Sequence, residues 1–130
     1  MEIIKQINYL KQHYQMAIPQ EYVDFISKTD FFDYADTMLS TNGMEIELNH
    51  FLKEDDEYPS RDLLSWYSYA AKEREDYLTI AMGYGNEEIA IKVKGRDCGG
   101  VYYIEQTEET TVKKLYHNFN ELKKYLTKEN

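Results

Sequence analysis

The sequence of 130 residues is long enough for one domain with one hydrophobic core, and we expect a single domain over residues 1–130. Hydrophobic residues (42%) and aromatic residues (15%) offer enough apolar surface for folding, which excludes a disordered chain. The formal net charge of −9 argues against nucleic-acid binding, because such binding needs a basic face that neutralises phosphates.

Two helices are predicted in the first 27 residues. The first has one apolar face made of Ile3, Ile4, Ile7, Leu10 and Tyr14. The second is expected to begin at Pro19, a residue that suits a first helical turn, and to bury Tyr22, Phe25 and Ile26. Both helices therefore offer one side to a core.

A β-hairpin is predicted next. Residues 31–39 favour a strand, although their pattern is irregular, and Asn42-Gly43 is a strong signal for a two-residue hairpin turn. The strand after this turn alternates apolar and acidic residues, so its acidic face is expected to point to solvent. The apolar positions are Met44, Ile46 and Leu48, and the acidic positions are Glu45 and Glu47.

The middle of the chain combines an acidic loop with a helix. Glu54-Asp55-Asp56-Glu57 predicts an exposed loop, and Ser60 is placed to cap a helix that runs to about Glu75. The helix carries a broad apolar stripe of Leu63, Leu64, Trp66, Tyr67, Ala70 and Ala71. Trp66 and Tyr67 belong to this stripe and are expected in the core, whereas Tyr69 lies off the stripe.

Three strands joined by short turns follow, and a helix closes the chain. The strands cover residues 78–82, 89–93 and 101–105, and in the second of them Ile89, Ile91 and Val93 alternate with Glu88, Lys92 and Lys94. The closing helix is marked by Leu115, Phe119, Leu122 and Leu126, with Asn118 as the cap of its main part. The fold class is therefore α+β, with a single antiparallel sheet of five to six strands, helices at both termini and one mid-chain helix.

Motifs for catalysis are weak. The glycines around Tyr84 and around Cys98 precede strands, whereas a phosphate loop precedes a helix, so both segments are expected to be turns. The single cysteine excludes an intramolecular disulfide, and the three histidines are not spaced like metal ligands. We therefore expect no enzyme activity, cofactor or metal, while a small hydrolase or deaminase that uses Cys98 or a carboxylate pair stays as an alternative.

The segment Met1 to Gln6 lacks the basic and apolar regions of a signal peptide, and no apolar run reaches membrane-spanning length. Together with the unpaired cysteine, this predicts a cytoplasmic protein without membrane contact.

Acidic and tyrosine residues are concentrated in the middle of the sequence. Residues 44–88 hold 12 carboxylates against 4 Lys and Arg, and the chain has 13 tyrosines. An acidic field attracts a basic partner, and aromatic anchors inside a charged rim are typical of interfaces. Solubility alone also explains a negative charge, and tyrosines also line sheets. The predicted partner-binding residues are Glu54, Asp55, Asp56, Glu57, Tyr58, Tyr69, Tyr84, Glu87 and Glu88.

Several segments resemble the SUKH superfamily, in the order in which that superfamily has them. Ile18-Pro19-Gln20-Glu21-Tyr22-Val23-Asp24-Phe25-Ile26 resembles its opening signature on a short helix. Residues 77–86, 100–103 and 119–126 look like its strand with a glycine-bearing turn, its next strand and its closing helix. One departure is Thr29-Asp30-Phe31, which stands where the superfamily usually carries Asn-Gly.

The superfamily takes in yeast cell-wall-synthesis regulators and many bacterial immunity proteins, and it has no catalytic residues to carry over. The resemblance implies an immunity protein that binds and neutralises a cognate toxin. The acidic charge predicts that this toxin is basic, and a nuclease is one candidate. The alternative is a regulatory or scaffold module that binds a cellular protein. The residues do not fix the oligomeric state.

Overall fold

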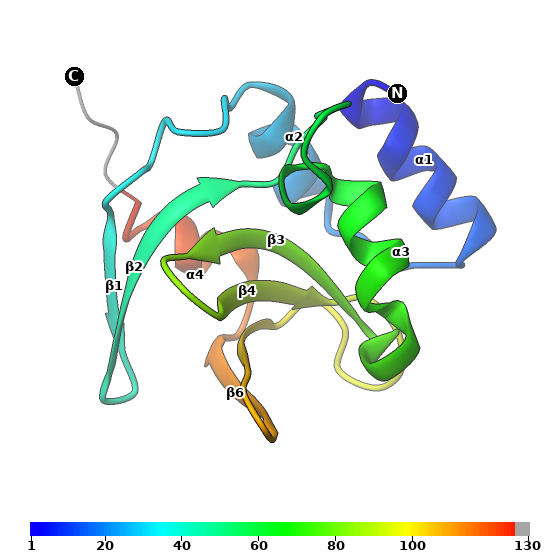
Figure 1. Ribbon diagram of the computed structural model, residues 1–130. Helices are drawn as coiled ribbons and strands as arrows, with labels where there is room; N and C mark the ends of the chain where they lie inside the picture. Colours follow the sequence, from blue (N-terminus) through cyan, green and yellow to red (C-terminus); the bar gives the residue numbers. More distant parts are fainter. Residues whose placement is uncertain (127–130) are drawn as a thin grey trace.

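The helices and strands occur in separate runs along the chain, as expected for an α+β protein. A computed structural model describes residues 1–126, apart from the side chains of residues 71 and 72. Figure 1 shows how the elements are arranged. In chain order they are α1 (Ile3–His13), α2 (Gln20–Ser27), β1 (Met38–Thr41), β2 (Met44–Phe51), η1 (Pro59–Arg61), α3 (Leu63–Arg74), β3 (Tyr77–Gly83), β4 (Glu87–Lys92), β5 (Val101–Gln106), β6 (Thr110–Tyr116) and α4 (Phe119–Lys123).

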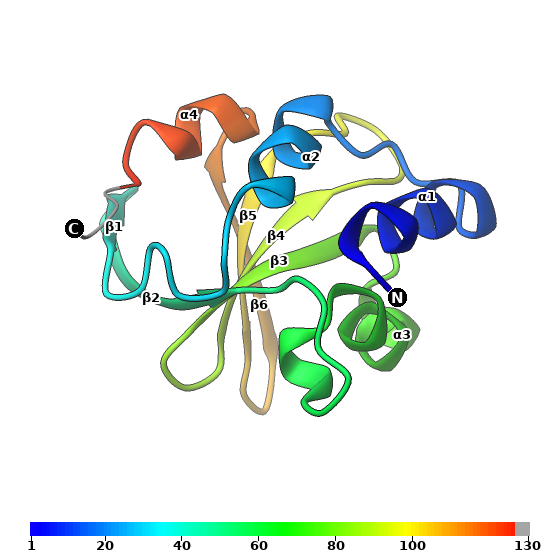
Figure 2. The same cartoon turned by 90° about the horizontal axis from the view of Figure 1, so that it is seen from above.

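All six strands form one antiparallel sheet in the order β1-β2-β3-β4-β5-β6, which confirms the predicted fold class. The sheet curls strongly (Figures 1 and 2). The strand register shifts between Leu48 and His50 and again between Thr79 and Ala81, and such bulges increase twist and bending. The curl brings the two edges of the sheet together. The side-chain amide of Asn42, in the β1–β2 turn, donates a hydrogen bond of 2.9 Å to the Lys114 carbonyl on β6.

The core lies on one face of this curled sheet. Figure 2 shows α1, α2 and α4 over that face. Aromatic rings join the helices to the sheet: the ring centroid of Phe25 lies 5.2 Å from that of Phe51 and 5.1 Å from that of Phe119. Tyr22 and Ile26 on α2 are fully buried. The predicted apolar faces of the first two helices are therefore confirmed, with α2 beginning one residue after Pro19.

The predicted strand over residues 31–39 is confirmed only at its end, Met38 and Leu39, and is wrong before it. Residues 31–36 form turns, and β1 begins at Met38. This turn segment is held beside β2 by isolated hydrogen bonds, from the Phe51 N–H to the Phe31 carbonyl and from the Asp36 N–H to the Leu48 carbonyl. The hairpin turn at Asn42-Gly43 is confirmed, with φ values of 52° and 77°, as the favoured two-residue turn requires.

The closing helix begins later than predicted. Leu115 lies in β6, a strand that the sequence pattern does not mark, because its first five residues are exposed and do not alternate. Pairing with β5 specifies this strand instead. Asn118 caps α4 as predicted, since its side chain accepts a hydrogen bond of 2.9 Å from the Glu121 N–H.

Asp62, rather than Ser60, caps α3. Its Oδ2 accepts from the Ser65 N–H at 3.0 Å, and its Oδ1 accepts from the Asp55 N–H at 2.9 Å and from Gln6 Nε2 at 2.8 Å. Gln6 Oε1 in turn accepts from the Leu64 N–H at 2.8 Å. This Gln6–Asp62 network ties α1, the acidic loop and α3 together, and both of its central side chains are buried.

The predicted stripe of α3 points inward in part. Leu63 and Tyr67 are buried, and Leu64, Trp66 and Ala70 are half-buried. Ala71 lies outside the described side chains. No helix in residues 1–126 has the length and apolarity to pass through a bilayer.

The hydroxyl of Tyr22 is buried and has no hydrogen-bond partner among the described residues, and burial raises its pKa far above the usual range. An unsatisfied buried hydroxyl costs roughly 1–3 kcal/mol. We expect Tyr22→Phe to raise the free energy of unfolding by about 1 kcal/mol in urea denaturation.

The matched control is Tyr67→Phe, because the Tyr67 hydroxyl donates a hydrogen bond of 2.8 Å to the Glu75 carbonyl. This control is expected to lose about 1 kcal/mol, since it removes the donor from a satisfied pair. A loss of stability in both variants would contradict the statement that the buried Tyr22 hydroxyl lacks a hydrogen-bond partner.

Candidate functional site

A groove lies beside α3, where that helix meets the strands. It consists of two adjoining hollows of about 380 and 440 Å³. Trp66, Tyr69 and Gln106 line both hollows. The other walls come from β2, from η1 and from the turn between β3 and β4, which contribute Asn49, Ser60 and Asn86. In Figure 2 the β3–β4 and β5–β6 turns point away from the layer of α2 and α4.

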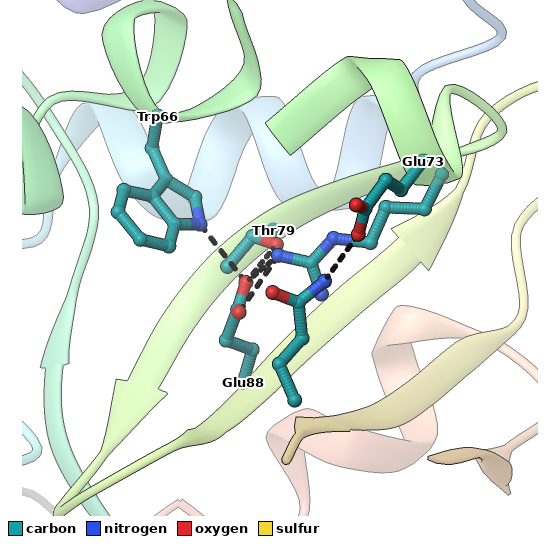
Figure 3. A network of polar contacts seen from close by, with 6 residues as sticks. Trp66, Glu73, Thr79 and Glu88 are labelled. Carbon is teal, nitrogen blue, oxygen red and sulfur yellow. Dashed lines mark hydrogen bonds and ion pairs between the residues drawn. The ribbon is translucent and has the colours of Figure 1, made fainter. Parts of the chain in front are cut away.

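The floor of the groove is a buried ion pair between Glu88 on β4 and Arg74 on α3 (Figure 3). Arg74 Nη2 donates to Glu88 Oε1 at 2.6 Å and to Oε2 at 2.7 Å. Oε1 also accepts from Trp66 Nε1 at 2.9 Å and from Thr79 Oγ1 at 2.7 Å. Low polarity around the pair strengthens these bonds, so the network fixes α3 against β3 and β4.

The burial of Glu88 corrects the expectation from alternation. Its neighbours Ile89 and Ile91 face the core, so the pattern puts Glu88 on the opposite face, and that assignment of faces is right. The opposite face is not open to solvent at this position, because α3 covers it, and Glu88 is 5% exposed. Glu88 therefore cannot present its charge directly to a partner.

Four aromatic side chains, which we name the aromatic rim, are exposed, and one of them, Tyr69, lines both hollows of the groove. The four are Phe32 (51% exposed), Tyr58 (49%), Tyr69 (75%) and Tyr84 (48%). They are four of the six exposed aromatic side chains in residues 1–126. Each comes from a different segment of the chain. The sequence predicts three of them, Tyr58, Tyr69 and Tyr84, as partner-binding residues, and of these Tyr69 lines the groove.

Specific contacts hold the rim residues. The guanidinium carbon of Arg61 lies 5.3 Å from the ring centroid of Phe32 and 4.7 Å from that of Tyr58, within the range of cation–π attraction. Tyr69 packs against Trp66, with ring centroids 5.3 Å apart. These contacts lower the entropy that the rings would lose on binding.

Tyr84 is held by a hydrogen bond instead of a ring contact. Its hydroxyl donates a hydrogen bond of 2.6 Å to Asp36 Oδ1, and this bond raises the pKa of Tyr84.

His50 connects the rim with the groove. Its ring lies 6.1 Å from that of Phe32, and its Nε2 donates to the Ser60 carbonyl at 3.2 Å. Burial lowers the pKa of His50, and the nearby charge of Arg61 lowers it further, while the hydrogen bond to Ser60 opposes both. His50 is therefore neutral at pH 7, and the histidine adds no positive charge to an otherwise acidic surface.

Glu87 belongs to an acidic end of the sheet. It is half-buried and stands directly opposite Glu105 in the β4–β5 ladder. Burial, followed by the charges of Glu105 and Glu47, raises the pKa of Glu87. Like charges at this spacing repel one another, so a basic side chain of a partner would be favoured here.

The acidic loop divides into structural and exposed residues. Asp55 Oδ1 accepts from the N–H groups of Glu57 and Tyr58, both at 2.8 Å, and these bonds lower the pKa of Asp55. One carboxylate oxygen of Glu54 is buried without a partner among the described residues. Asp56 and Glu57 are exposed, and the loop lies beside Met1 and Glu2 rather than in the groove.

Sequence reasoning missed several residues of this site. Trp66 was assigned to the core, whereas it is half-buried in the groove wall. No helix or strand pattern singles out Phe32, Arg61 or Arg74, and His50 enters only among the three histidines considered as metal ligands. A detectable signal was the short segment Tyr58 to Arg61, because tyrosine and arginine together are typical of binding hot spots.

Within residues 1–126 no three His, Cys, Asp or Glu side chains are grouped as metal ligands would be. Cys98 is exposed and donates to the Gly95 carbonyl at 3.2 Å. The one buried carboxylate among the described lining residues of the groove, Glu88, accepts hydrogen bonds from Arg74, Trp66 and Thr79.

A family model matches nearly the whole chain. The model of the SMI1 / KNR4 family (SUKH-1) matches residues 4–124, from the first turn of α1 to the end of α4. No curated protein and no solved structure matches the chain.

Proposed function

Because the chain belongs to the SMI1 / KNR4 family (SUKH-1), we propose that it is an immunity protein that binds and neutralises a basic bacterial toxin domain through protein–protein contact. Family membership carries this proposal, since the family includes toxin immunity proteins. Residues 44–88 hold 12 carboxylates and only 4 Lys and Arg, and this negative charge supports a basic partner.

Charged and aromatic side chains have different roles in the proposed binding. Exposed carboxylates such as Asp56 and Glu57 steer a basic partner toward the molecule, which speeds encounter. The aromatic rim supplies large side chains of low conformational entropy, and such side chains form most binding hot spots. Arg61 adds a planar cation that its two neighbouring rings already hold in place.

The test is to capture the partner from the source cells and to express it in a sensitive host with and without this protein. We expect the captured partner to stop growth and co-expression to restore it. A captured partner that is harmless to the host would contradict toxin neutralisation and would favour the regulatory or scaffold alternative.

Association kinetics with the captured partner then test the steering role. Asp56→Lys together with Glu57→Lys is expected to slow association about tenfold at low salt and to flatten its salt dependence. The matched control is Glu21→Lys with Asp24→Lys on α2, which changes the net charge equally at exposed positions away from the groove. Equal slowing in both variants would show that total charge, rather than the loop, sets the rate.

A further inference from the structure

The groove beside α3 contains polar groups that the fold itself leaves unused. Among the described residues the side-chain amides of Asn49 and Asn86 have no hydrogen-bond partner, although both line the groove. Gln106 makes one long contact, of 3.4 Å from its Nε2 to Glu73 Oε2. Amide side chains both donate and accept, so they can pair with the N–H and carbonyl groups of an extended main chain.

The described lining residues of the groove carry one uncompensated negative charge. Among its described lining residues, Arg74 and Glu88 neutralise each other, and His50 is kept neutral by burial. Glu73, at the rim and exposed, is the remaining charge, and its nearest partner is the weakly bonded amide of Gln106. A cation is therefore attracted to this groove, whereas an anion is repelled.

The ring of Tyr69 gives this cation a second contact. Tyr69 is 75% exposed and stands on the same helix as Glu73, four residues before it, which puts both side chains on one face of α3. A guanidinium is planar, so it can stack on a tyrosine ring while it donates two hydrogen bonds to a carboxylate. A lysine ammonium matches this pair of groups less well, because it lacks a flat face.

We propose that the groove formed by Trp66, Tyr69, Glu73 and the amides of Asn49, Asn86 and Gln106 binds an extended, arginine-bearing segment of the partner protein. The arginine stacks on Tyr69 and pairs with Glu73, and the amides bind the main chain beside it. This assignment rests on the proposed function, because it names which part of a basic partner the protein holds.

Trp66 is the single tryptophan of the sequence and lies in the groove wall, so its fluorescence reports on this site. The probe is the capped peptide Gly-Arg-Gly-Arg-Gly, titrated while Trp66 emission and backbone amide shifts are followed. We expect a saturable change in Trp66 emission, with amide shifts concentrated at the groove residues. The same peptide with citrulline, which has nearly the same shape without the charge, is expected to bind at least tenfold more weakly.

Two exposed positions supply the variants, so neither is expected to disturb folding. Tyr69→Ala and Glu73→Gln should each weaken peptide binding at least fivefold, whereas Tyr9→Ala and Glu21→Gln, at exposed positions on α1 and α2, should leave it unchanged. Equal binding of the arginine and citrulline peptides, or amide shifts confined to another surface, would overturn the groove assignment.

The two proposals fail separately. A toxin that is neutralised while the arginine peptide leaves the groove unperturbed would remove this inference and leave the function standing. A peptide that binds as expected, together with a captured partner that is not toxic, would remove the toxin and leave the groove as the binding site.

Discussion

Glu88→Gln is expected to lower the free energy of unfolding by about 3–5 kcal/mol, although alternation in the sequence assigns this residue to the solvent face. The substitution removes the charge that compensates Arg74, and the side chains of this pair are 4% (Arg74) and 6% (Glu88) exposed. An uncompensated guanidinium in an apolar site is far more costly than the loss of one exposed ion pair. Urea denaturation of the purified variant measures the effect directly.

A double-mutant cycle separates the cost of a lone charge from the value of the pair. Arg74→Met alone is expected to be nearly as destabilising as Glu88→Gln, because it leaves the carboxylate buried with two neutral donors. The double variant Arg74→Met with Glu88→Leu is expected to be more stable than either single variant. Two guanidinium nitrogens of Arg74, Nε and Nη1, already lack acceptors among the described residues, so the native pair is incompletely satisfied.

Recovery in the double variant should stay partial, since Trp66 Nε1 and Thr79 Oγ1 lose their acceptor when Glu88 is replaced. Glu73→Gln, one residue before Arg74 but exposed, is the control and should change stability by less than about 0.5 kcal/mol. Additive losses in the double variant would contradict the assignment of the cost to an unpaired charge.

Asp62→Ala is expected to lower the free energy of unfolding by about 2–4 kcal/mol. The substitution removes the N-cap of α3, which costs about 1 kcal/mol. It also leaves the Gln6 amide and the Asp55 N–H without their acceptor, and these unsatisfied donors cost roughly 1 kcal/mol or more. Asp56→Ala is the matched control, because Asp56 is exposed and lies in the same acidic loop. The control should be within about 0.5 kcal/mol of the native protein.

The same residue gives a pH signature. Burial of Asp62 opposes ionisation, but the hydrogen bonds from the Asp55 N–H, Ser65 and Gln6 outweigh it, so the pKa of Asp62 lies below its ordinary value of 3.8. A carboxyl group with a lowered folded-state pKa stabilises the fold above the unfolded-state pKa and loses that stabilisation as pH falls through the folded-state pKa.

The stability difference between the native protein and Asp62→Ala should therefore be full at pH 6 and should shrink below pH 3.8. A difference that stays constant to pH 2 would mean that the ionised carboxylate does not carry the effect.

The acidic middle segment serves more than one purpose in the folded protein. Its carboxylates divide between groups that hold the fold, such as Asp55, Asp62 and Glu88, and groups that are exposed, such as Asp56 and Glu57. Net charge along the sequence therefore overstates the charge that a partner can meet. The proposed steering effect has to come from the exposed group.

Local patterns in the sequence were sufficient for the fold class and for most elements. Helix α1, helix α2, the Asn42-Gly43 turn and strands β3 to β5 follow from periodicity and turn chemistry, which act between near neighbours. Strand β6 cannot be predicted in this way because its exposed residues carry no alternation. Residues 31–36 favour a strand by their aromatic content but form turns.

The sequence by itself determined that this protein is an acidic α+β domain with exposed tyrosines at positions 58, 69 and 84. Tertiary structure alone decided that Glu88 lies under α3, that Gln6 meets Asp62 across 56 residues, and that side chains from α3, β2 and β5 line one groove. The physical reason is that periodicity fixes which face of an element a side chain lies on. Whether that face meets water or another element depends on contacts between residues that are distant in the chain.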